Sequence, residues 1–193
     1  MGAASEAAVS RLVGAVLVGG ESSRMGTDKA SLVVDGVELG RRAVDALRGA
    51  GLDDVMLVGA TEAHASLPGR PVDDLWPGEG PVGAVLTALH EAFLAGGSGV
   101  VCLPCDLPGV AASDVTVLVD ASAGAGSKQV TLAAVGGRRA FPVGVWPIAL
   151  LPALEDRFGD GASSFRELLD GIDVAEVEVG DGFVDADTPN DLS

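Results

Sequence analysis

The sequence predicts an α/β fold, a three-layer α/β/α sandwich built on a mostly parallel sheet. Short runs rich in β-branched residues alternate with longer segments of helical periodicity, as in a sheet covered by helices. Two of these runs, Leu12–Val18 and Gly99–Pro104, are almost continuously apolar, which is typical of strands buried on both faces. The 193 residues are 48% hydrophobic, and a chain of this length buries about 70% of its unfolded surface. We therefore expect a single domain spanning residues 1–193.

Six segments are predicted to be strands. In chain order they are Leu12–Val18, Asp54–Gly59, Gly99–Pro104, Gln129–Val135, Phe141–Trp146 and Asp173–Val179. The last segment alternates apolar and polar residues more than the others do, which places it nearer an edge of the sheet.

The clearest helix is predicted over residues 80–97. Pro81 suits its first turn, and Gly96 and Gly97 end it. Its apolar residues recur at helical spacing and should face the core: Val82, Val85, Leu86, Leu89 and Phe93.

Two further segments between strands have a less regular pattern. A helix is predicted over residues 36–51, with Val44 and Leu47 buried and Gly51 at its end. Residues 110–122 contain valines that alternate as in a strand, but the segment stands where a crossover helix is expected. We favour the helix.

A short helix is predicted over residues 163–171. Ser164 is followed three residues later by Glu167, which is the pattern of a capping box, and Gly171 ends the helix.

The net charge of −16 limits the partners of this chain. Nucleic acids and anionic membranes attract basic surfaces, so neither is an expected partner. A small anionic substrate remains possible, because a local pocket can differ in sign from the whole protein. No apolar run approaches the roughly 18 residues of a membrane span, and residues 1–10 lack the basic region of a signal peptide. We therefore expect a cytoplasmic protein.

Cys102 and Cys105 form a C-x-x-C pattern, which occurs in redox pairs and in zinc sites. A zinc site needs more ligands, but there is no second cysteine pair, and His64 and His90 lie far away in the sequence. We favour a Cys102 that is packed inside a strand, and we interpret the two histidines as surface or helix residues.

A glycine-rich loop follows the first predicted strand. Gly19 and Gly20 allow positive φ angles, so consecutive N–H groups can form an anion-binding concavity. Hydroxyl groups and positive charge come from Ser22, Ser23, Arg24 and Lys29, where Lys29 is one of only two lysines in the chain. Together these groups could cradle a triphosphate. On composition alone, a glycine-rich turn with exposed charges is an alternative.

Two standard phosphate-binding motifs do not explain this loop. A Walker A loop has its lysine directly after the second glycine, but here Gly20 to Gly26 is one residue too long, and two residues precede Lys29. A literal G-x-G-x-x-G occurs at Gly78 to Gly83, but no strand is predicted directly before it. A dinucleotide-binding fold is therefore not favoured.

The string LVGGESSRMGTDKASL, residues 17–32, closely resembles the L-A-G-G-x-S-x-R-M-G-x-D-K signature of the nucleotidyltransferase family typified by molybdenum cofactor guanylyltransferase. Further segments resemble family motifs in the expected order: PGEGPVGAVLTAL, LPCDLPGV, FPVGVW, SSFRELLDG and VDADTPNDL. The resemblance spans Ala15 to Leu192. It implies a Rossmann-like fold of the nucleotide-diphospho-sugar transferase type.

The resemblance also implies a reaction. The expected activity is Mg²⁺-dependent transfer of GMP from GTP to phosphorylated molybdopterin, with release of pyrophosphate. GTP and molybdopterin are the expected small-molecule partners, with transient contact to cofactor-biosynthesis or molybdoenzyme proteins. One alternative keeps the fold but changes the base or acceptor, as in a cytidylyltransferase or a sugar- or alcohol-phosphate nucleotidyltransferase. Another is a non-catalytic nucleotide-binding module, which would not need Arg24, Lys29 and Asp106 together.

The resemblance assigns roles to individual residues. It implies that Lys29 contacts the α-phosphate, Arg24 clamps the leaving phosphates and Asp106 binds the metal. Asp187 is a candidate second metal ligand or acceptor contact with Asp185 behind it, although a solvated pair is a close alternative. The expected nucleotide-binding residues are Leu17, Val18, Gly19, Gly20, Ser22, Lys29, Asp74, Gly80 and Asp106.

The double glycine resembles the guanylyl branch of the family, so guanine is the expected base. Two residues depart from the family pattern: Val18 replaces the usual alanine, and Gly59 stands where some members have an asparagine. The first is expected to narrow the base pocket and the second to remove one base contact. Arg138 and Arg139 could meet an anionic acceptor, but we favour a surface pair.

Overall fold

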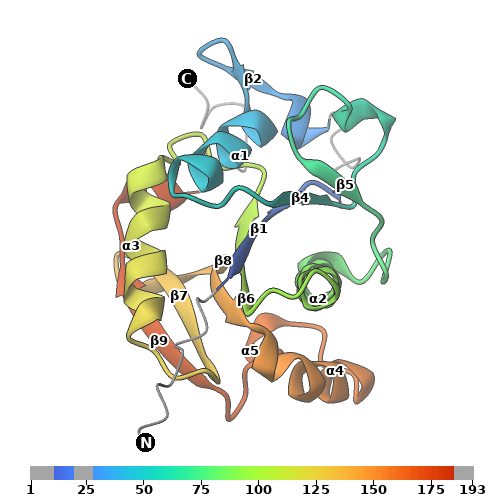
Figure 1. Cartoon of the computed structure of the whole chain (residues 1–193), viewed down its shortest axis with the longest axis vertical. Helices are drawn as coiled ribbons and strands as arrows, with labels where there is room; N and C mark the ends of the chain where they lie inside the picture. Colours follow the sequence, from blue (N-terminus) through green and yellow to red (C-terminus); the bar gives the residue numbers. More distant parts are fainter. Residues whose placement is uncertain (1–10, 20–27, 185–193) are drawn as a thin grey trace, which may run out of the picture.

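The computed structural model describes residues 11–19 and 28–184, which form a seven-stranded sheet with helices on both faces (Figure 1). The strand order is β5-β4-β1-β6-β8-β7-β9. The strands are β1 (Leu12–Leu17), β4 (Val55–Val58), β5 (Arg70–Val72), β6 (Gly99–Pro104), β7 (Gln129–Val135), β8 (Arg138–Pro147) and β9 (Asp173–Glu178). Of these described strands, only β8 runs antiparallel to its neighbours, so the predicted mostly parallel α/β fold is confirmed.

The burial of each strand follows its sequence pattern. β1 and β6 lie side by side at the centre and are buried along nearly their whole length. β9 lies at one edge and alternates between exposed and half-buried residues, as predicted. β7 and β8 are joined by Gly136 and Gly137, which both have positive φ angles, as two-residue hairpin turns require.

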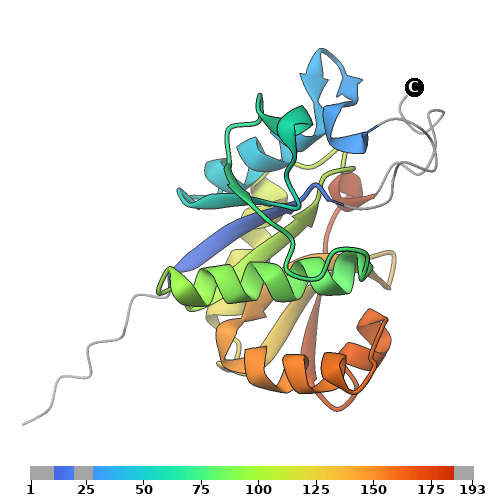
Figure 2. The same cartoon turned by 90° about the vertical axis from the view of Figure 1, so that its right-hand side faces the viewer.

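Helices cover the two faces of the sheet, as Figures 1 and 2 show. One face carries α1 (Leu39–Gly49) and α3 (Ala112–Ala123), and the other carries α2 (Gly80–Leu94), α4 (Leu151–Gly159) and α5 (Phe165–Leu168). The ambiguous segment is therefore the helix α3, as we favoured, because burying Val115 and Leu118 satisfies helical spacing. Single turns of 3-10 helix occur at η2 (Lys29–Ser31), η3 (Glu62–His64), η4 (Ile148–Leu150) and η5 (Asp181–Phe183).

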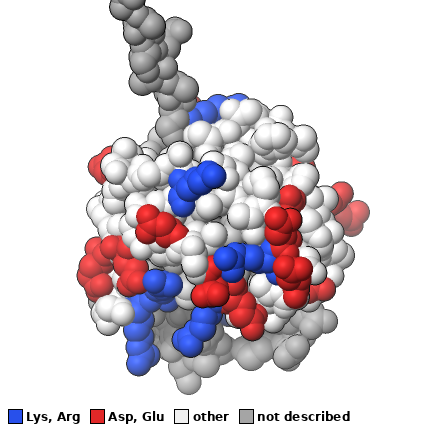
Figure 3. All heavy atoms as spheres, turned by 90° about the horizontal axis from the view of Figure 1, so that it is seen from below, with Lys and Arg blue, Asp and Glu red and all other residues white. Residues whose placement is uncertain are grey.

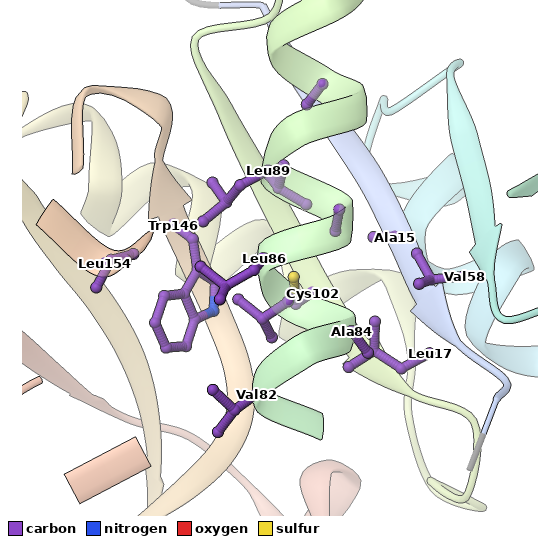
Figure 4. Close-up of a cluster of buried hydrophobic side chains, with 14 of the residues drawn as sticks. Ala15, Leu17, Val58, Val82, Ala84, Leu86, Leu89, Cys102, Trp146 and Leu154 are labelled. Carbon is purple, nitrogen blue, oxygen red and sulfur yellow. The ribbon is translucent and has the colours of Figure 1, made fainter. Parts of the chain in front are cut away.

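Each face of the sheet packs into its own hydrophobic cluster. Figure 4 shows the cluster around α2, in which Leu86 lies beside the Trp146 ring of β8. On the side of α2 nearer β1, Ala84 lies close to Leu17. The indole N–H of Trp146 donates to the Pro142 carbonyl at 3.0 Å, so this large buried side chain leaves no unsatisfied donor.

Several elements were missed or misplaced by the sequence analysis. The edge strand β5 was missed, because it is short and contains a proline. Residues 33–38 form a small hairpin of β2 (Val33–Val34) and β3 (Val37–Glu38), so α1 begins at Leu39 rather than Gly36. The helix α4 was also missed. Phe93 was wrong as a core residue, because its side chain at the end of α2 is 58% exposed.

Both cysteines are free thiols inside the protein. Cys102 is fully buried in β6, as expected. Burial raises the pKa of the Cys102 thiol far above its usual value, so it stays protonated. The interpretation of Cys102 as a core residue is confirmed.

None of the helices within residues 11–19 and 28–184 is both long and apolar enough to cross a bilayer. On the face seen in Figure 3, basic side chains lie in small groups among acidic ones. That face therefore carries no broad basic surface of the kind that attracts polyanions.

The capping box of α5 has the predicted form. The Ser164 hydroxyl accepts a hydrogen bond from the Glu167 N–H at 3.3 Å, and the Glu167 carboxylate accepts one from the Ser164 N–H at 3.1 Å. Hydrogen bonds from Ser163 and Ser164 hold the pKa of Glu167 below its usual value. The carboxylate's contribution is therefore present at neutral pH and is lost as the pH falls through this lowered pKa.

We expect Ser164→Ala to lower the free energy of unfolding by about 1 kcal/mol, because the cap of α5 loses its acceptor. Urea denaturation at pH 7 measures this change. Ser127→Ala, at an exposed turn position, is the matched control and should stay within about 0.5 kcal/mol of the parent. Equal effects of the two substitutions would contradict the capping assignment.

Candidate active site

A cavity of about 470 Å³ lies at the edge of the sheet where β1 and β6 end. The side chain of Leu17 and the backbone of Gly19 contribute from β1 and its loop, and Asp106 contributes from the loop after β6. Gly80 and Pro81, at the start of α2, form another wall. Ligands of open α/β sheets bind at this edge, beyond the carboxyl ends of parallel strands.

An ion pair lies in the lining of this cavity. The Lys29 ammonium lies 2.8 Å from the Asp106 carboxylate oxygen Oδ2, although the two residues are 77 positions apart in the sequence. Their side chains are 27% and 16% exposed, so both charges are partly shielded from water while still open to a ligand. The cavity thus holds a cation and a carboxylate side by side, as phosphate and metal binding require.

Lys29 is positioned by the residue before it. Asp28 is the N-cap of η2, and its carboxylate accepts hydrogen bonds from the Ala30 N–H at 3.1 Å and the Ser31 hydroxyl at 2.7 Å. Partial burial acts to raise the pKa of Asp28, but the hydrogen bond from Ser31 and the close His64 ring outweigh it, so the pKa lies below its usual value. Asp28 is therefore ionised at neutral pH and fixes the turn that carries Lys29.

His64 was expected to be a surface or helix residue; it belongs to the 3-10 turn η3 but is buried rather than at the surface. It ends η3, its side chain is 5% exposed, and its Nε2 atom lies 2.8 Å from Asp28 Oδ2. His90 is a helix residue as predicted, lies on α2 and pairs with Glu155 at 3.0 Å.

Gly19 and Gly59 bring the loops after β1 and β4 into direct backbone contact. A Cβ atom on Gly19 would lie 2.9 Å from the Gly59 Cα, and one on Gly59 would lie 2.6 Å from the Gly19 Cα. Gly59 also has a φ of +75°, which L-residues rarely adopt. The departure noted at residue 59 therefore has a steric reason, because no side chain fits there.

We expect Gly59→Ala to destabilise the protein by about 1–3 kcal/mol, since it combines a positive φ with a backbone clash. Chemical denaturation followed by circular dichroism measures the change. The matched control is Gly159→Ala, where a Cβ would meet nothing within 4 Å. If Gly59→Ala were as stable as the control, the close approach of the two loops would be wrong.

The structure brings five of the predicted nucleotide-binding residues to the cavity: Leu17, Gly19, Lys29, Gly80 and Asp106. Val18 is buried beside them and does not line the cavity. Five other predicted site residues, Gly20, Ser22, Arg24, Asp185 and Asp187, lie outside the described residues, and their roles stay predictions.

Asp74 lies in the loop before α2 and is not among the residues that line the cavity. Its Oδ1 atom accepts hydrogen bonds from the Trp76 N–H at 3.0 Å and the Thr87 hydroxyl at 3.1 Å. These bonds tie the loop to α2. A role of Asp74 in nucleotide binding stays a prediction.

The strand β8 also lines this cavity, a contribution that was not predicted from the sequence. The part of β8 from Arg139 to Val143 lines the cavity, together with Lys29 and Asp106. Because β8 is antiparallel, its beginning lies at the edge where β6 ends. The guanidinium of Arg139 pairs with Glu176 of β9 at 2.8 Å, and its side chain also borders a second cavity of about 600 Å³. The available signals were the basic pair Arg138 and Arg139, which begin β8, and the FPVGVW motif that follows them.

Cys105 also lines the cavity, next to Asp106. Burial, followed by the nearby charge of Asp106, raises the pKa of its thiol to about 12. Without a bound metal ion the thiol therefore stays protonated at neutral pH, and Cys105 is not an activated nucleophile.

The described residues contain no cluster of three or more side chains able to hold a metal ion. Asp106 nevertheless fits Mg²⁺, which binds proteins through one or two carboxylates and takes its other ligands from phosphates and water. The donor set, a hard carboxylate oxygen without thiolate or imidazole, suits this ion better than zinc.

Residues 14–177 match the family described as the MobA-like NTP transferase domain. The chain belongs to this family. It is 33% identical over 195 residues to a molybdenum cofactor guanylyltransferase of Rhizobium johnstonii, an alignment that covers 95% of this chain and 90% of that protein. A probable molybdenum cofactor guanylyltransferase of Opitutus terrae is 42% identical over 105 residues, which are 54% of this chain and 52% of that one. As a MobA-like NTP transferase, the chain is a nucleotidyltransferase enzyme.

Solved structures share the fold of this MobA-like chain. Molybdopterin-guanine dinucleotide biosynthesis protein A from Archaeoglobus fulgidus aligns with a TM-score of 0.70 at 20% identity, over 93% of this chain and 94% of that one. A Mycobacterium tuberculosis protein crystallised in complex with manganese aligns with a TM-score of 0.63 at 20% identity, over 89% of each chain. The predicted nucleotidyltransferase fold is confirmed.

Proposed function

We propose that this MobA-like enzyme transfers GMP from GTP to phosphorylated molybdopterin and releases pyrophosphate. The observation that carries the proposal is the Lys29–Asp106 pair at 2.8 Å in the cavity where β1 and β6 end. The proposed guanine nucleotide and molybdenum-cofactor acceptor are supported by relatives that are named molybdenum cofactor guanylyltransferases. Localisation in the cytoplasm follows from the same proposal, since GTP is a cytoplasmic substrate.

The chemistry needs charge stabilisation rather than a protein nucleophile. A phosphate oxygen of the acceptor attacks the α-phosphorus of GTP in line, the bond to the bridging oxygen breaks, and pyrophosphate leaves. Negative charge develops on the α-phosphate oxygens and on the leaving group. Lys29 faces this charge directly, and the Gly19 backbone in the cavity wall lets the substrate approach closely.

Asp106 is the residue that would hold the divalent ion. Bound there with the substrate phosphates, Mg²⁺ would neutralise charge on the phosphate oxygens and orient them for attack. Asp106 and Lys29 pair with each other in the lining of the cavity, so each is oriented before substrate enters. This preorganisation reduces the rearrangement needed in the transition state.

The acceptor is proposed to enter from the β8 side of the cavity. Arg139 and Phe141 line both the main cavity and the adjoining cavity of about 600 Å³, and Arg138 and Arg166 border the latter. A phosphorylated aromatic ring system matches a wall of arginines and an aromatic side chain. The alternative that Arg138 and Arg139 are only a surface pair predicts no change in the acceptor KM when both are replaced.

The test is incubation of the protein with Mg²⁺, phosphorylated molybdopterin and each of the four ribonucleoside triphosphates, followed by measurement of pyrophosphate. Of the four nucleotides, we expect only GTP to give pyrophosphate. We expect no pyrophosphate when the acceptor or Mg²⁺ is left out. Activity with CTP but not GTP would replace the guanine assignment by cytosine. Activity with a sugar phosphate in place of molybdopterin would overturn the proposed acceptor.

A further inference from the structure

His64 is a buried histidine to which the proposed reaction assigns no role. It ends the single turn η3, which packs against η2, the turn that carries Lys29. The two turns belong to different loops, one after β1 and the other between β4 and β5. A contact between them can therefore fix the position of one loop relative to the other.

The hydrogen bonds around His64 determine which ring nitrogen carries the proton. The Thr61 backbone N–H donates to Nδ1 at 3.0 Å, so Nδ1 is an acceptor and holds no proton. In the neutral ring the proton is therefore on Nε2, and Nε2 lies 2.8 Å from Asp28 Oδ2. The ring accepts a hydrogen bond from the Thr61 backbone and touches the carboxylate that caps η2 through a close Nε2–Oδ2 contact, which is not aligned as a hydrogen bond.

Asp28 transmits this contact to Lys29. The same Oδ2 atom accepts from the Ser31 hydroxyl at 2.7 Å, and Oδ1 accepts from the Ala30 N–H at 3.1 Å. Lys29 lies between Asp28 and these two donors and extends to Asp106 at 2.8 Å. Any rotation of the Asp28 carboxylate would shift the turn and with it the Lys29 side chain.

We propose that His64 is a positioning residue, which orients Asp28 so that the η2 turn holds the Lys29 ammonium at Asp106 and at the phosphates of the nucleotide. The effect of His64 on turnover rests on the proposed function. Its effect on the position of the Lys29 side chain does not. A histidine that only filled the core would act through its volume, and any residue of similar size would replace it.

Two conservative substitutions separate these possibilities. The His64→Asn variant keeps an acceptor near the Nδ1 position for the Thr61 N–H but has no donor at the Nε2 position. The His64→Gln variant places an amide N–H about as far from the backbone as Nε2, so it keeps a polar N–H beside the Asp28 carboxylate. The matched control is His90→Gln, because His90 is 38% exposed on α2 and pairs with Glu155.

The first measurement needs no substrate. Lys29 and Lys128 are the only lysines in the chain, so protein with ¹³C-labelled lysine gives two sets of side-chain NMR signals. Lys128→Arg assigns them, and the exposed Lys128 serves as an internal reference. We expect His64→Asn to shift the Lys29 Cε–Hε signals, His64→Gln to restore them in large part, and His90→Gln to leave them unchanged.

The second measurement is steady-state pyrophosphate release, at a temperature where thermal melts show each variant to be folded. We expect His64→Asn to lower kcat about tenfold with less than a twofold change in the KM for GTP, and His64→Gln to recover most of kcat. The split between kcat and KM follows because Lys29 acts mainly on charge that develops during transfer.

The outcomes distinguish the two claims. An unchanged Lys29 signal in His64→Asn, or equal losses in the two His64 variants, would overturn the positioning role. A shifted Lys29 signal in a protein whose parent form shows no pyrophosphate release would support the positioning role and overturn only the proposed reaction.

Discussion

Asp106→Asn should abolish nucleotidyl transfer while leaving the fold intact. The amide has the shape of the carboxylate but lacks the charge that binds a divalent ion and pairs with Lys29 at 2.8 Å. Asp106 is the one carboxylate among the described residues that line the cavity, so its removal is expected to lower kcat by at least about 10³-fold. Pyrophosphate release measured over a range of Mg²⁺ concentrations gives this loss, and the residual rate should no longer respond to Mg²⁺.

The matched control is Asp54→Asn. Asp54 pairs with Arg11 at 3.2 Å and directly precedes β4, which places it at the opposite edge of the sheet from the cavity. Its replacement should leave both kcat and the Mg²⁺ dependence unchanged. An Asp106→Asn variant with near-normal, Mg²⁺-dependent turnover would show that the metal is held elsewhere.

Lys29→Ala should lower kcat by about 10²–10³-fold, the loss typical of removing one charged donor from a transition state. Lys29 is the described cation that faces Asp106 in the cavity, so its loss leaves charge on the α-phosphate less well stabilised. Lys29→Arg should recover only part of the rate, because a planar guanidinium does not reproduce the point charge of an ammonium. Single-turnover kinetics at saturating GTP measure the chemical step directly.

Lys128→Ala is the control for this experiment, since Lys128 is an exposed loop residue and the only other lysine. It should be active at the parent rate. If Lys29→Ala lost only GTP affinity and kept kcat, then Lys29 would act in ground-state binding rather than in the transfer step. That result would leave the site in place but change the role of the residue.

Much of the fold could be predicted because it depends on local patterns. The continuous apolar runs that became β1 and β6 indicated buried central strands, and the Ser164–Glu167 pair indicated a helix start that the structure reproduces. Elements with a weak local signal were missed. β5 is only three residues long and contains Pro71, so its local pattern is too short to indicate a strand.

The candidate site was likewise predicted only in part. Lys29 and Asp106 were identified from motifs in separate segments, but their distance of 2.8 Å follows only from the parallel pairing of β1 with β6. The contribution of Arg139 and Phe141 depends on β8 running antiparallel, a direction that no local pattern specifies. His64 was interpreted as a surface or helix residue because nothing nearby in the sequence indicates its partner, Asp28.

The sequence by itself determined the family, the fold class and the types of side chain at the site, because each is indicated by motifs of contiguous residues. Only the tertiary structure decided which residues meet: the side chains of Lys29 and Asp106, the side chains of Asp28 and His64, and the backbones of Gly19 and Gly59. The physical reason is that secondary structure responds to residues within a few positions. Strand order and direction result instead from packing whole elements against one another, to which residues along the entire chain contribute.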